Sequence, residues 1–521
     1  MDFFFPLLFL ALLPFPLLLA VPAHRLRVLR PLALWCSLPP FFWSLGGAFL
    51  FDPVSSLKGG WVEVASLGWL SSFQIPYVLA LDGVSLAFIV LSTFLTPICI
   101  LASWESIRYR QRTFLLLLFA VQLCLIHAFG ARDLLLFYLS FEAVVIPVFI
   151  IIGLWGSRLR RIGAAFRFFL YTIVGSLLML VALVYLYLTT GSLHLSVLDG
   201  VSLDPTREFL LWFALFASFA TKIPMVPLHV WLPEAHVEAP TAGSVLLAGI
   251  LLKLGGYGFF RFSLPLFPQA SCRLAPLVFM LSLLAILYSS LATLVQVDLK
   301  KAIAYSSVAH MNYATLGLFS GTSEGLGGAL VLMVSHGLVS SGLFLAVGFL
   351  YDRYGSRLLR YYGGLAQLMP VYAGLLLVLF LANLSLPGTL SFVPEFLVLL
   401  GAFGANTFVA LGATFGVIFS AAYSIWLYNR LCFGPVSSAL SAYSDLNGRE
   451  LSLLVPLVVL VLVFGVFPAP LLAPFQFPLS LLLLDAHGSV SLGFAFVATR
   501  FFSIGCSAGT FGVGSSHQSA W

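Results

Sequence analysis

Charged residues are scarce in this chain of 521 residues. Asp, Glu, Lys and Arg make up 8% of it, whereas 61% of the residues are hydrophobic and the mean hydropathy is +1.08. A water-soluble protein of this length needs far more polar surface. The composition therefore excludes a soluble globular fold and predicts an all-α polytopic membrane protein.

Cysteine motifs and nucleotide-binding motifs are also missing. The six Cys residues are scattered and form no C-x-x-C pair, which argues against a zinc site, an iron–sulfur cluster or a disulfide framework. Neither G-x-G-x-x-G between a strand and a helix nor G-x-x-x-x-G-K-[ST] occurs. The glycine-rich stretch 255–258 lies inside an apolar segment, where glycines are typical of close helix packing. We expect this chain to bind no cofactor, no metal and no nucleic acid.

Long apolar segments dominate what is present. Windows of about 20 apolar residues predict fourteen membrane spans. Their limits are 3–22, 31–50, 81–102, 113–130, 133–155, 167–189, 209–230, 241–262, 276–296, 301–320, 325–351, 371–401, 407–432 and 451–472. The first segment lacks a basic start and carries Asp2, so we interpret it as a span and not as a cleaved signal.

The basic residues predict an orientation for these spans. Loops after the odd-numbered spans hold 17 of the 25 Lys and Arg residues, and loops after the even-numbered spans hold 5. Lys and Arg are enriched in loops on the inner side of a membrane. We therefore expect the odd-numbered loops on the cytoplasmic or matrix side and both termini on the other side. The net charge of +6 then reflects membrane topology and does not imply nucleic-acid binding.

Two predicted spans contain helix-breaking residues in their middle. Pro224 and Pro227 should break the seventh span just after Lys222, because proline removes a backbone donor. Pro387 and Gly388 should break the twelfth span in the same way. The breaks lie five spans apart, and an odd offset inverts the second unit relative to the first. The alternative is that these are ordinary proline kinks without functional meaning.

This offset predicts an architecture of two inverted five-helix repeats, each with a broken helix, which is typical of transporters. The predicted parts are three N-terminal helices in 1–112, the repeats in 113–262 and 276–432, a fourteenth helix in 451–472 and a C-terminal tail of unknown role in 485–521.

Four charged residues fall inside the predicted spans and away from the span ends: Glu142, Lys222, Lys253 and Glu395. A charge at the centre of a bilayer costs roughly 2.5–3.5 kcal/mol on insertion scales, and such charges tend to lie on ion or proton paths. A lysine partner stabilises the ionised form of a carboxylate, so we expect Glu142 to interact with Lys222. The alternative is a static ion pair that only holds helices together.

Lys253 lies in the middle of its span, far from both ends. Burial disfavours the charged form of a lysine, so we expect Lys253 to exchange a proton near neutral pH. The alternative, a lysine that reaches the membrane interface, does not fit this position. Glu395 lies beside the second break, and its alternative is a helix-end charge in a loop.

Histidines titrate near neutral pH and suit proton relays. His310 and His336 lie within the tenth and eleventh spans, among Ser and other small residues that leave room for water. The alternative is a structural role for each. His229, His236 and His127 lie near span ends and rank lower. The predicted line is Glu142, Lys222, Lys253, His310 or His336, and Glu395, in which a change of charge at one member alters the proton affinity of the next.

Several segments resemble the antiporter-like subunits of respiratory complex I. They are FASFATKIPMVPLHVWLPEAHVEAPTAGSVLLAGILLKLGGYGFFRF, QVDLKKAIAYSSVAHMN, VSHGLVSSGLF and LSLPGTLSFVPEF. Three further segments look like the plant and green-algal mitochondrial form: LLFYLSFEAVVIPVFIIIGLWGSR, LYDRYGSRLLRYYGGL and SDLNGRE. The resemblance covers about residues 75–470. It implies a fourteen-helix subunit in the proton-pumping arm of NADH:ubiquinone oxidoreductase, in the mitochondrial inner membrane. Bacterial and thylakoid membranes are the alternatives.

The resemblance also implies roles for the buried residues. Glu142 and Lys222 match the coupled pair of the family, Lys253 its central lysine and Glu395 its terminal charge. His310 and His336 match the histidines that connect the central lysine to the exit in the family.

The implied partners are the lipid bilayer and other membrane-arm subunits, including two other antiporter-like subunits. NADH, FMN, iron–sulfur clusters and ubiquinone are expected in other subunits. Pro394 is a departure, since many relatives have Gly there, and the 485–521 tail resembles nothing in the family. One alternative is a stand-alone or Mrp-type cation/proton antiporter, which shares the core motifs. Another is a spacer subunit that holds neighbouring subunits and moves no protons.

Overall fold

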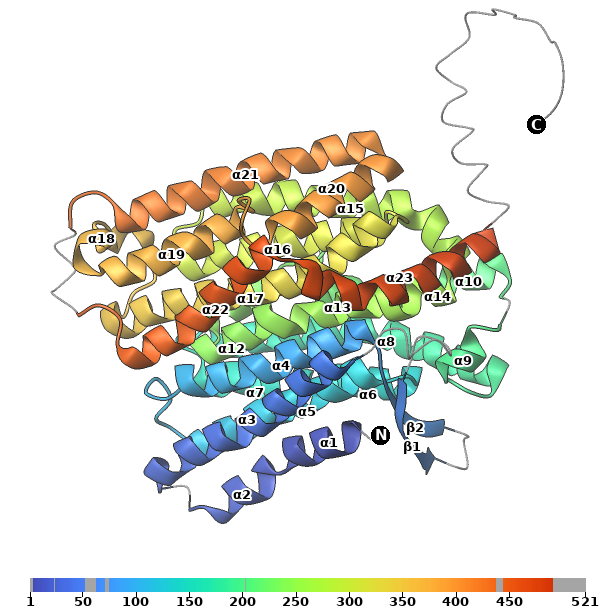
Figure 1. Ribbon diagram of the computed structural model, residues 1–521, viewed down its shortest axis with the longest axis horizontal. Coiled ribbons are helices and arrows are strands. Elements are labelled where there is room, and N and C mark those ends of the chain that lie inside the picture. Colours follow the sequence, from blue (N-terminus) through green and yellow to red (C-terminus); the bar gives the residue numbers. More distant parts are fainter. Residues whose placement is uncertain are drawn as a thin grey trace, which may run out of the picture.

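Apolar helices packed side by side form nearly all of the structure (Figure 1). The computed structural model describes residues 3–22, 24–51, 62–70, 75–201, 203–436 and 444–490. Within these residues, ten helices are long and apolar enough to cross a membrane, and four shorter apolar helices accompany them. The predicted polytopic helical fold is therefore confirmed.

The elements, in chain order, are α1 (Phe4–Leu12), α2 (Pro14–Ala20), α3 (Leu26–Leu50), β1 (Val62–Leu70), β2 (Ile75–Leu81), α4 (Gly83–Ala102), α5 (Gln111–Gly130), α6 (Leu134–Ala143), α7 (Val145–Trp155), α8 (Arg161–Thr190), α9 (Leu195–Leu198), α10 (Pro205–Lys222), α11 (Trp231–Glu238), α12 (Thr241–Leu246), η2 (Leu247–Leu251), α13 (Leu252–Gly258), η3 (Phe259–Ser263), α14 (Leu264–Leu266), α15 (Pro268–Leu294), α16 (Leu299–Leu318), α17 (Ser323–Tyr354), η4 (Leu359–Tyr361), α18 (Leu365–Leu368), α19 (Pro370–Asn383), α20 (Phe392–Ala405), α21 (Thr407–Cys432), α22 (Gly448–Val466) and α23 (Ala469–Val490).

The first thirteen predicted spans each correspond to one helix or to consecutive helical segments. The first span is bent at Leu13 into α1 and α2, and the fifth is divided at Val144 into α6 and α7. The seventh and twelfth spans are broken as predicted, since α10 ends at Lys222 and α19 ends at Asn383.

The end of the chain differs from the prediction. The helix expected over 451–472 stops at Val466, and Pro468 precedes a further helix, α23. Proline cannot donate the backbone hydrogen bond that would continue α22. Residues 485–490 of the predicted tail belong to α23, and the rest of that tail lies outside the described residues. Figure 1 shows α22 and α23 end to end, both in red, across the middle of the molecule.

A two-stranded antiparallel hairpin, β1 with β2, precedes α4 and was not predicted. Its register pairs Val62 with Leu81 and Leu70 with Ile75. A bridge from Leu79 to Ala131 ties the hairpin to the end of α5. Windows of about 20 residues detect membrane helices, whereas strands this short are not distinguished by them.

The core is formed by α17 and by the span from Thr241 to Leu266, both fully buried in their most apolar 18-residue stretch. Glycines allow this packing, as predicted for the 255–258 stretch. A β-carbon added at Gly256 would lie 2.3 Å from the sulfur of Met333 in α17, and one at Gly258 would lie 2.3 Å from the ring of Phe219 in α10. These helices therefore approach more closely than any larger residue permits.

Basic loops gather at one end of the helices. Arg158, in the loop before α8, pairs with Asp298 before α16 at 3.9 Å. Arg357, after α17, donates to the Ser157 hydroxyl at 2.6 Å. We call the end of the bundle formed by these loops the basic face. The loops joined there follow odd-numbered spans, as the charge distribution predicted.

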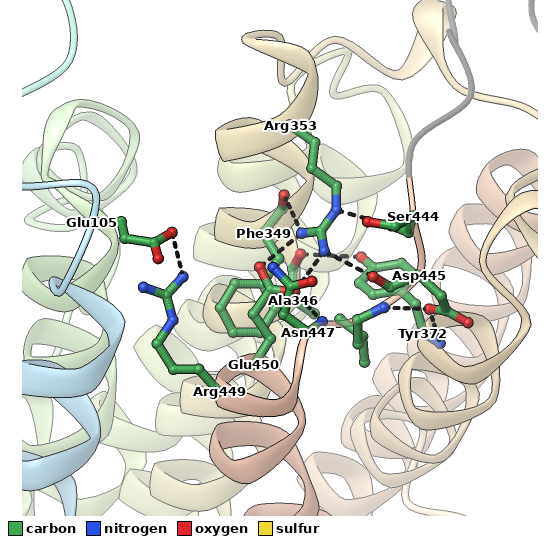
Figure 2. A network of polar contacts seen from close by, with 11 residues as sticks. Glu105, Ala346, Phe349, Arg353, Tyr372, Ser444, Asp445, Asn447, Arg449 and Glu450 are labelled. Atoms are coloured by element: carbon green, nitrogen blue, oxygen red, sulfur yellow. Dashed lines mark hydrogen bonds and ion pairs between the residues drawn. The ribbon is translucent and has the colours of Figure 1, made fainter.

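The C-terminal helices are anchored at the basic face by a polar network (Figure 2). Arg353, in the last turn of α17, donates to both carboxylate oxygens of Glu450 in α22, at 2.8 and 2.6 Å. Asp445 accepts the backbone N–H of Tyr372 in α19 at 3.2 Å. Arg449 pairs with Glu105 at 3.0 Å. These contacts hold the first turns of α19 and α22 against α17 and the loop after α4.

Candidate proton-transfer site

Lys253 lies at the centre of the core, in α13, with a side chain that is 0% exposed. Its Nζ lies 2.8 Å from Nδ1 of His336 in α17 and also donates to the carbonyl oxygen of Ala248. The π-helical segments η2 and η3 flank α13 on both sides. Such segments inside α-helices are frequent at functional sites. The lysine is thus bonded both to a titratable group and to its own helix.

Two glycines set the distance between these helices. A β-carbon added at Gly337 would lie 2.9 Å from the carbonyl oxygen of Gly249 in η2, and one at Gly249 would lie 2.8 Å from the hydroxyl of Ser341. Gly337 directly follows His336 in the sequence. The close approach of η2 and α17 is therefore what brings the imidazole within reach of Lys253.

The line continues from His336 to Glu395. The rings of His336 and His310 have centroids 5.9 Å apart. His310 Nδ1 lies 2.8 Å from a carboxylate oxygen of Glu395, and its Nε2 lies 3.5 Å from the hydroxyl of Tyr423. Each of these side chains is at most 5% exposed. Both histidines therefore belong to one buried row of titratable groups that links Lys253 with Glu395.

The second helix break positions Glu395. The chain turns at Gly388, whose φ of +92° lies in a region that glycine adopts without strain. Glu395 follows in the first turn of α20, where the positive end of the helix dipole stabilises a carboxylate. Pro394 is the third residue of α20, and a backbone N–H at that position has no intrahelical partner. Pro394 is therefore compatible with a regular helix start at Glu395.

The first break positions Lys222, the last residue of α10, where the negative end of the helix dipole favours a cation. Its Nζ donates to the carbonyl oxygen of Phe141 at 3.3 Å and lies 4.2 Å from the centroid of the Phe141 ring. Glu142 is the next residue. Among the described residues it forms no ion pair within 4.0 Å, and its buried Oε1 has no hydrogen-bond partner. The structure brings Glu142 and Lys222 together without a direct ion pair.

His236 is more central than its sequence position indicated. It lies in α11, is 0% exposed, and stacks on the ring of Phe344 with centroids 4.7 Å apart. Neither of its ring nitrogens has a partner among the described residues, and buried polar atoms of this kind usually bind water.

His229 also lies in the segment after the break, against Tyr288. By contrast, Nδ1 of His127 bonds the Leu123 carbonyl of its own helix. The sequence signal that could have indicated a central position for His236 was its place, with His229, close to the proline break of the seventh span.

A second buried ion pair was missed because its members lie at predicted span ends. Arg261 in η3 pairs with Asp82, which caps α4 through the backbone N–H of Ser85. The Asp-x-x-Ser spacing was a detectable capping signal. Tyr257 accepts from Arg261 at 3.3 Å. This pair joins α4 to the lysine-bearing span and lies apart from the row of histidines.

Comparisons with known proteins identify the family of this chain. Residues 131–420 match the family described as "NADH:quinone oxidoreductase/Mrp antiporter, TM", and residues 61–128 match "NADH-ubiquinone oxidoreductase chain 4, amino terminus". Among solved structures, a chain of respiratory complex I from Thermus thermophilus is 34% identical, with a TM-score of 0.81 over 91% of this chain and 99% of that one. A chain of an archaeal membrane-bound sulfane sulfur reductase, at 22% identity and a TM-score of 0.80, covers 98% of this chain and 87% of its own and shows the shared fold alone.

Curated relatives are closer still. NADH-ubiquinone oxidoreductase chain 4 of Arabidopsis thaliana is 52% identical over 87% of this chain and 91% of its own length. The corresponding chain of Marchantia polymorpha is 50% identical over 89% and 93%. At this identity and coverage, the chain belongs to the NADH-ubiquinone oxidoreductase chain 4 family.

Proposed function

We propose that this chain is a proton-translocating membrane-arm subunit of respiratory complex I, the H⁺-translocating NADH:ubiquinone oxidoreductase. The chain's own side chains would transfer protons, while NADH oxidation and ubiquinone reduction take place in other subunits, which would hold FMN, the iron–sulfur clusters and the quinone. The relatives from plants and algae favour the mitochondrial inner membrane as its location. Its partners would be other membrane-arm subunits, two of them antiporter-like.

The observation that carries the proposal is the buried row from Lys253 through His336 and His310 to Glu395. Nζ of Lys253 lies 2.8 Å from Nδ1 of His336, and Nδ1 of His310 lies 2.8 Å from the carboxylate of Glu395. The centroids of the two imidazole rings lie 5.9 Å apart. A proton gained or lost at one group changes the charge felt by the next, which favours stepwise transfer without an open pore. Lys222 and Glu142 would supply the charge change that starts the sequence, because Lys222 ends a broken helix beside Glu142.

The test is Lys253→Met in the assembled complex, since methionine fills a similar volume without a proton. We expect NADH-driven proton pumping to fall at least tenfold, while electron transfer from NADH to an artificial acceptor that takes electrons before the membrane arm is unchanged. The matched control is Lys301→Met. Lys301 lies only partly buried near the start of α16, with Nζ 6.0 Å from the Tyr305 ring and outside the row, so pumping should remain normal.

Two other functions give different results. A stand-alone or Mrp-type antiporter would migrate on a native gel as a small complex without NADH-oxidising activity, whereas a complex I subunit migrates with the large NADH-oxidising assembly. A spacer subunit would assemble there too, but Lys253→Met, or Glu142→Ala, would leave the number of protons pumped per NADH unchanged. The match of residues 61–128 to the chain 4 amino terminus favours complex I over an Mrp antiporter.

A further inference from the structure

A groove of about 600 Å³ opens on the basic face, between the start of α3 and the start of α5. It lies far along the sequence from the row of titratable groups and plays no part in it. Its polar lining includes His24 from the segment before α3 and Arg108, Arg110 and Arg112 around the first turn of α5. No carboxylate is among its lining residues.

The positive charge of this groove is not neutralised within the described chain. None of Arg108, Arg110 and Arg112 has a carboxylate oxygen within 4.0 Å among the described residues. The nearby Glu105 pairs instead with Arg449. Three guanidinium groups that share a groove repel one another, and a bound anion removes that repulsion.

The backbone adds to this preference for an anion. The 20-residue helix α5 begins at the groove, and no side chain caps its first turn. The unpaired N–H groups of such a helix end attract negative charge. Arg112 also donates to the carbonyl oxygen of Val21 at 3.4 Å, which ties the first turn of α5 to the end of α2.

Apolar side chains on the neighbouring helices face outward. Leu17 and Leu19 of α2 are 37% and 57% exposed, and Val28 in the first turn of α3 is 49% exposed. These helices contact α5, so a ligand in the groove has exposed apolar surface beside it. A phosphate headgroup with attached acyl chains uses both the positive charge of the groove and this apolar surface, whereas a free phosphate uses only the positive charge.

We propose that this groove binds the headgroup of an anionic phospholipid from the inner leaflet, with its acyl chains along α2 and the start of α3. Clusters of Arg and Lys at the inner side of a membrane attract anionic lipids. Arg108 and Arg110 would contact the phosphate as charged donors, and Arg112 would hold α5 against α2 around it.

The test uses the intact complex in vesicles that contain phosphatidylglycerol or cardiolipin with a photoactivatable group in an acyl chain. After illumination, mass spectrometry of peptides from residues 14–30 measures lipid crosslinking. We expect strong crosslinking with the anionic lipids and at least tenfold less with photoactivatable phosphatidylcholine. Equal crosslinking by phosphatidylcholine would overturn the proposal, and so would displacement of the lipid by inorganic phosphate, because it would identify a phosphate site.

The variant Arg108→Gln/Arg110→Gln/Arg112→Gln should reduce crosslinking of these peptides at least tenfold. The matched control is Arg158→Gln/Arg160→Gln/Arg161→Gln, which removes three arginines from the same face and should leave crosslinking unchanged. Should the first triple variant not assemble, Arg110→Gln alone, at an exposed position, should still reduce crosslinking severalfold. Equal losses in the two triple variants, or crosslinking of these peptides to a neighbouring subunit in place of lipid, would contradict a lipid site.

Discussion

At the scale of residues, three of the four charges inside the predicted spans, all except Glu142, are stabilised by a feature that can be named. Lys253 is bonded to His336 and to its own helix, and Glu395 lies at a helix N-terminus and against His310. Lys222 lies at a helix C-terminus. Charges in a membrane core are costly unless they are paired or placed in this way. The row is therefore sensitive to small displacements of the helices that carry it.

Gly337→Ala tests this sensitivity without changing a charge. The new β-carbon would meet the backbone oxygen of Gly249 at 2.9 Å, so η2 and α17 must separate and Lys253 must move away from His336. We expect proton pumping per NADH to fall at least threefold, with a destabilisation of about 1–3 kcal/mol from overpacking. Pumping is measured in vesicles of the assembled complex, and stability by thermal inactivation.

Gly327→Ala in the same helix is the matched control. A β-carbon there meets only a terminal carbon of Leu479 at 3.4 Å, an ordinary contact. Both substitutions raise helix propensity by about 1 kcal/mol, so that effect cancels in the comparison. If Gly337→Ala pumped as well as Gly327→Ala, helix spacing would not control the contact between Lys253 and His336.

At the scale of elements, the breaks that carry Lys222 and Glu395 were predictable because proline acts locally on the backbone. Which of the two predicted histidines contacts Lys253 was not predictable, because the contact with His336 depends on a close approach of glycines 88 positions apart, Gly249 and Gly337. The contact of Lys222 with the Phe141 carbonyl, in place of an ion pair with Glu142, depends likewise on side-chain geometry. The sequence thus identified the candidate residues, whereas their contacts required the packed helices.

The break between α22 and α23 packs against the break between α19 and α20. The backbone N–H of Leu390 donates to the Val461 carbonyl oxygen at 3.0 Å. A β-carbon at Gly465 would lie 2.5 Å from the carbonyl oxygen of Gly388. The turn that leads to Glu395 is thus held partly by α22, an element whose end the span prediction did not locate. A substitution at Gly465 should therefore affect Glu395 although it lies in another helix.

We expect Gly465→Ala to displace this turn, because the atoms it meets are backbone and cannot rotate away. Overpacking costs about 1–3 kcal/mol, so the complex should inactivate at a lower temperature and pump fewer protons per NADH. Gly448→Ala, in the first turn of the same helix, has no atom within 4 Å of its β-carbon and should change neither property. A normal pumping ratio in Gly465→Ala would show that the contact with Gly388 does not position Glu395.

At the scale of the whole molecule, the row of titratable groups lies in the middle of the bundle while the loops of the basic face gather at one end. Figure 1 shows α13 and α17, which carry Lys253 and His336, between the N-terminal helices and the group α15, α20 and α21. The loops that form the basic face are joined by Arg158 with Asp298 and by Arg357 with Ser157. A proton released at either end of the bundle would thus enter compartments of different surface charge.

The orientation of the bundle gives the last prediction. Lys and Arg concentrate on the inner side of membranes, so the basic face should meet the matrix and the loop before α10 should lie on the outer side. We choose Arg360→Cys for the basic face and Thr206→Cys for the opposite end, both at exposed positions. A membrane-impermeant maleimide should label Thr206→Cys in right-side-out vesicles and Arg360→Cys in inverted vesicles, each above the unsubstituted chain. The reverse pattern would place the arginine-lined groove on the outer side, where it would no longer face the inner leaflet.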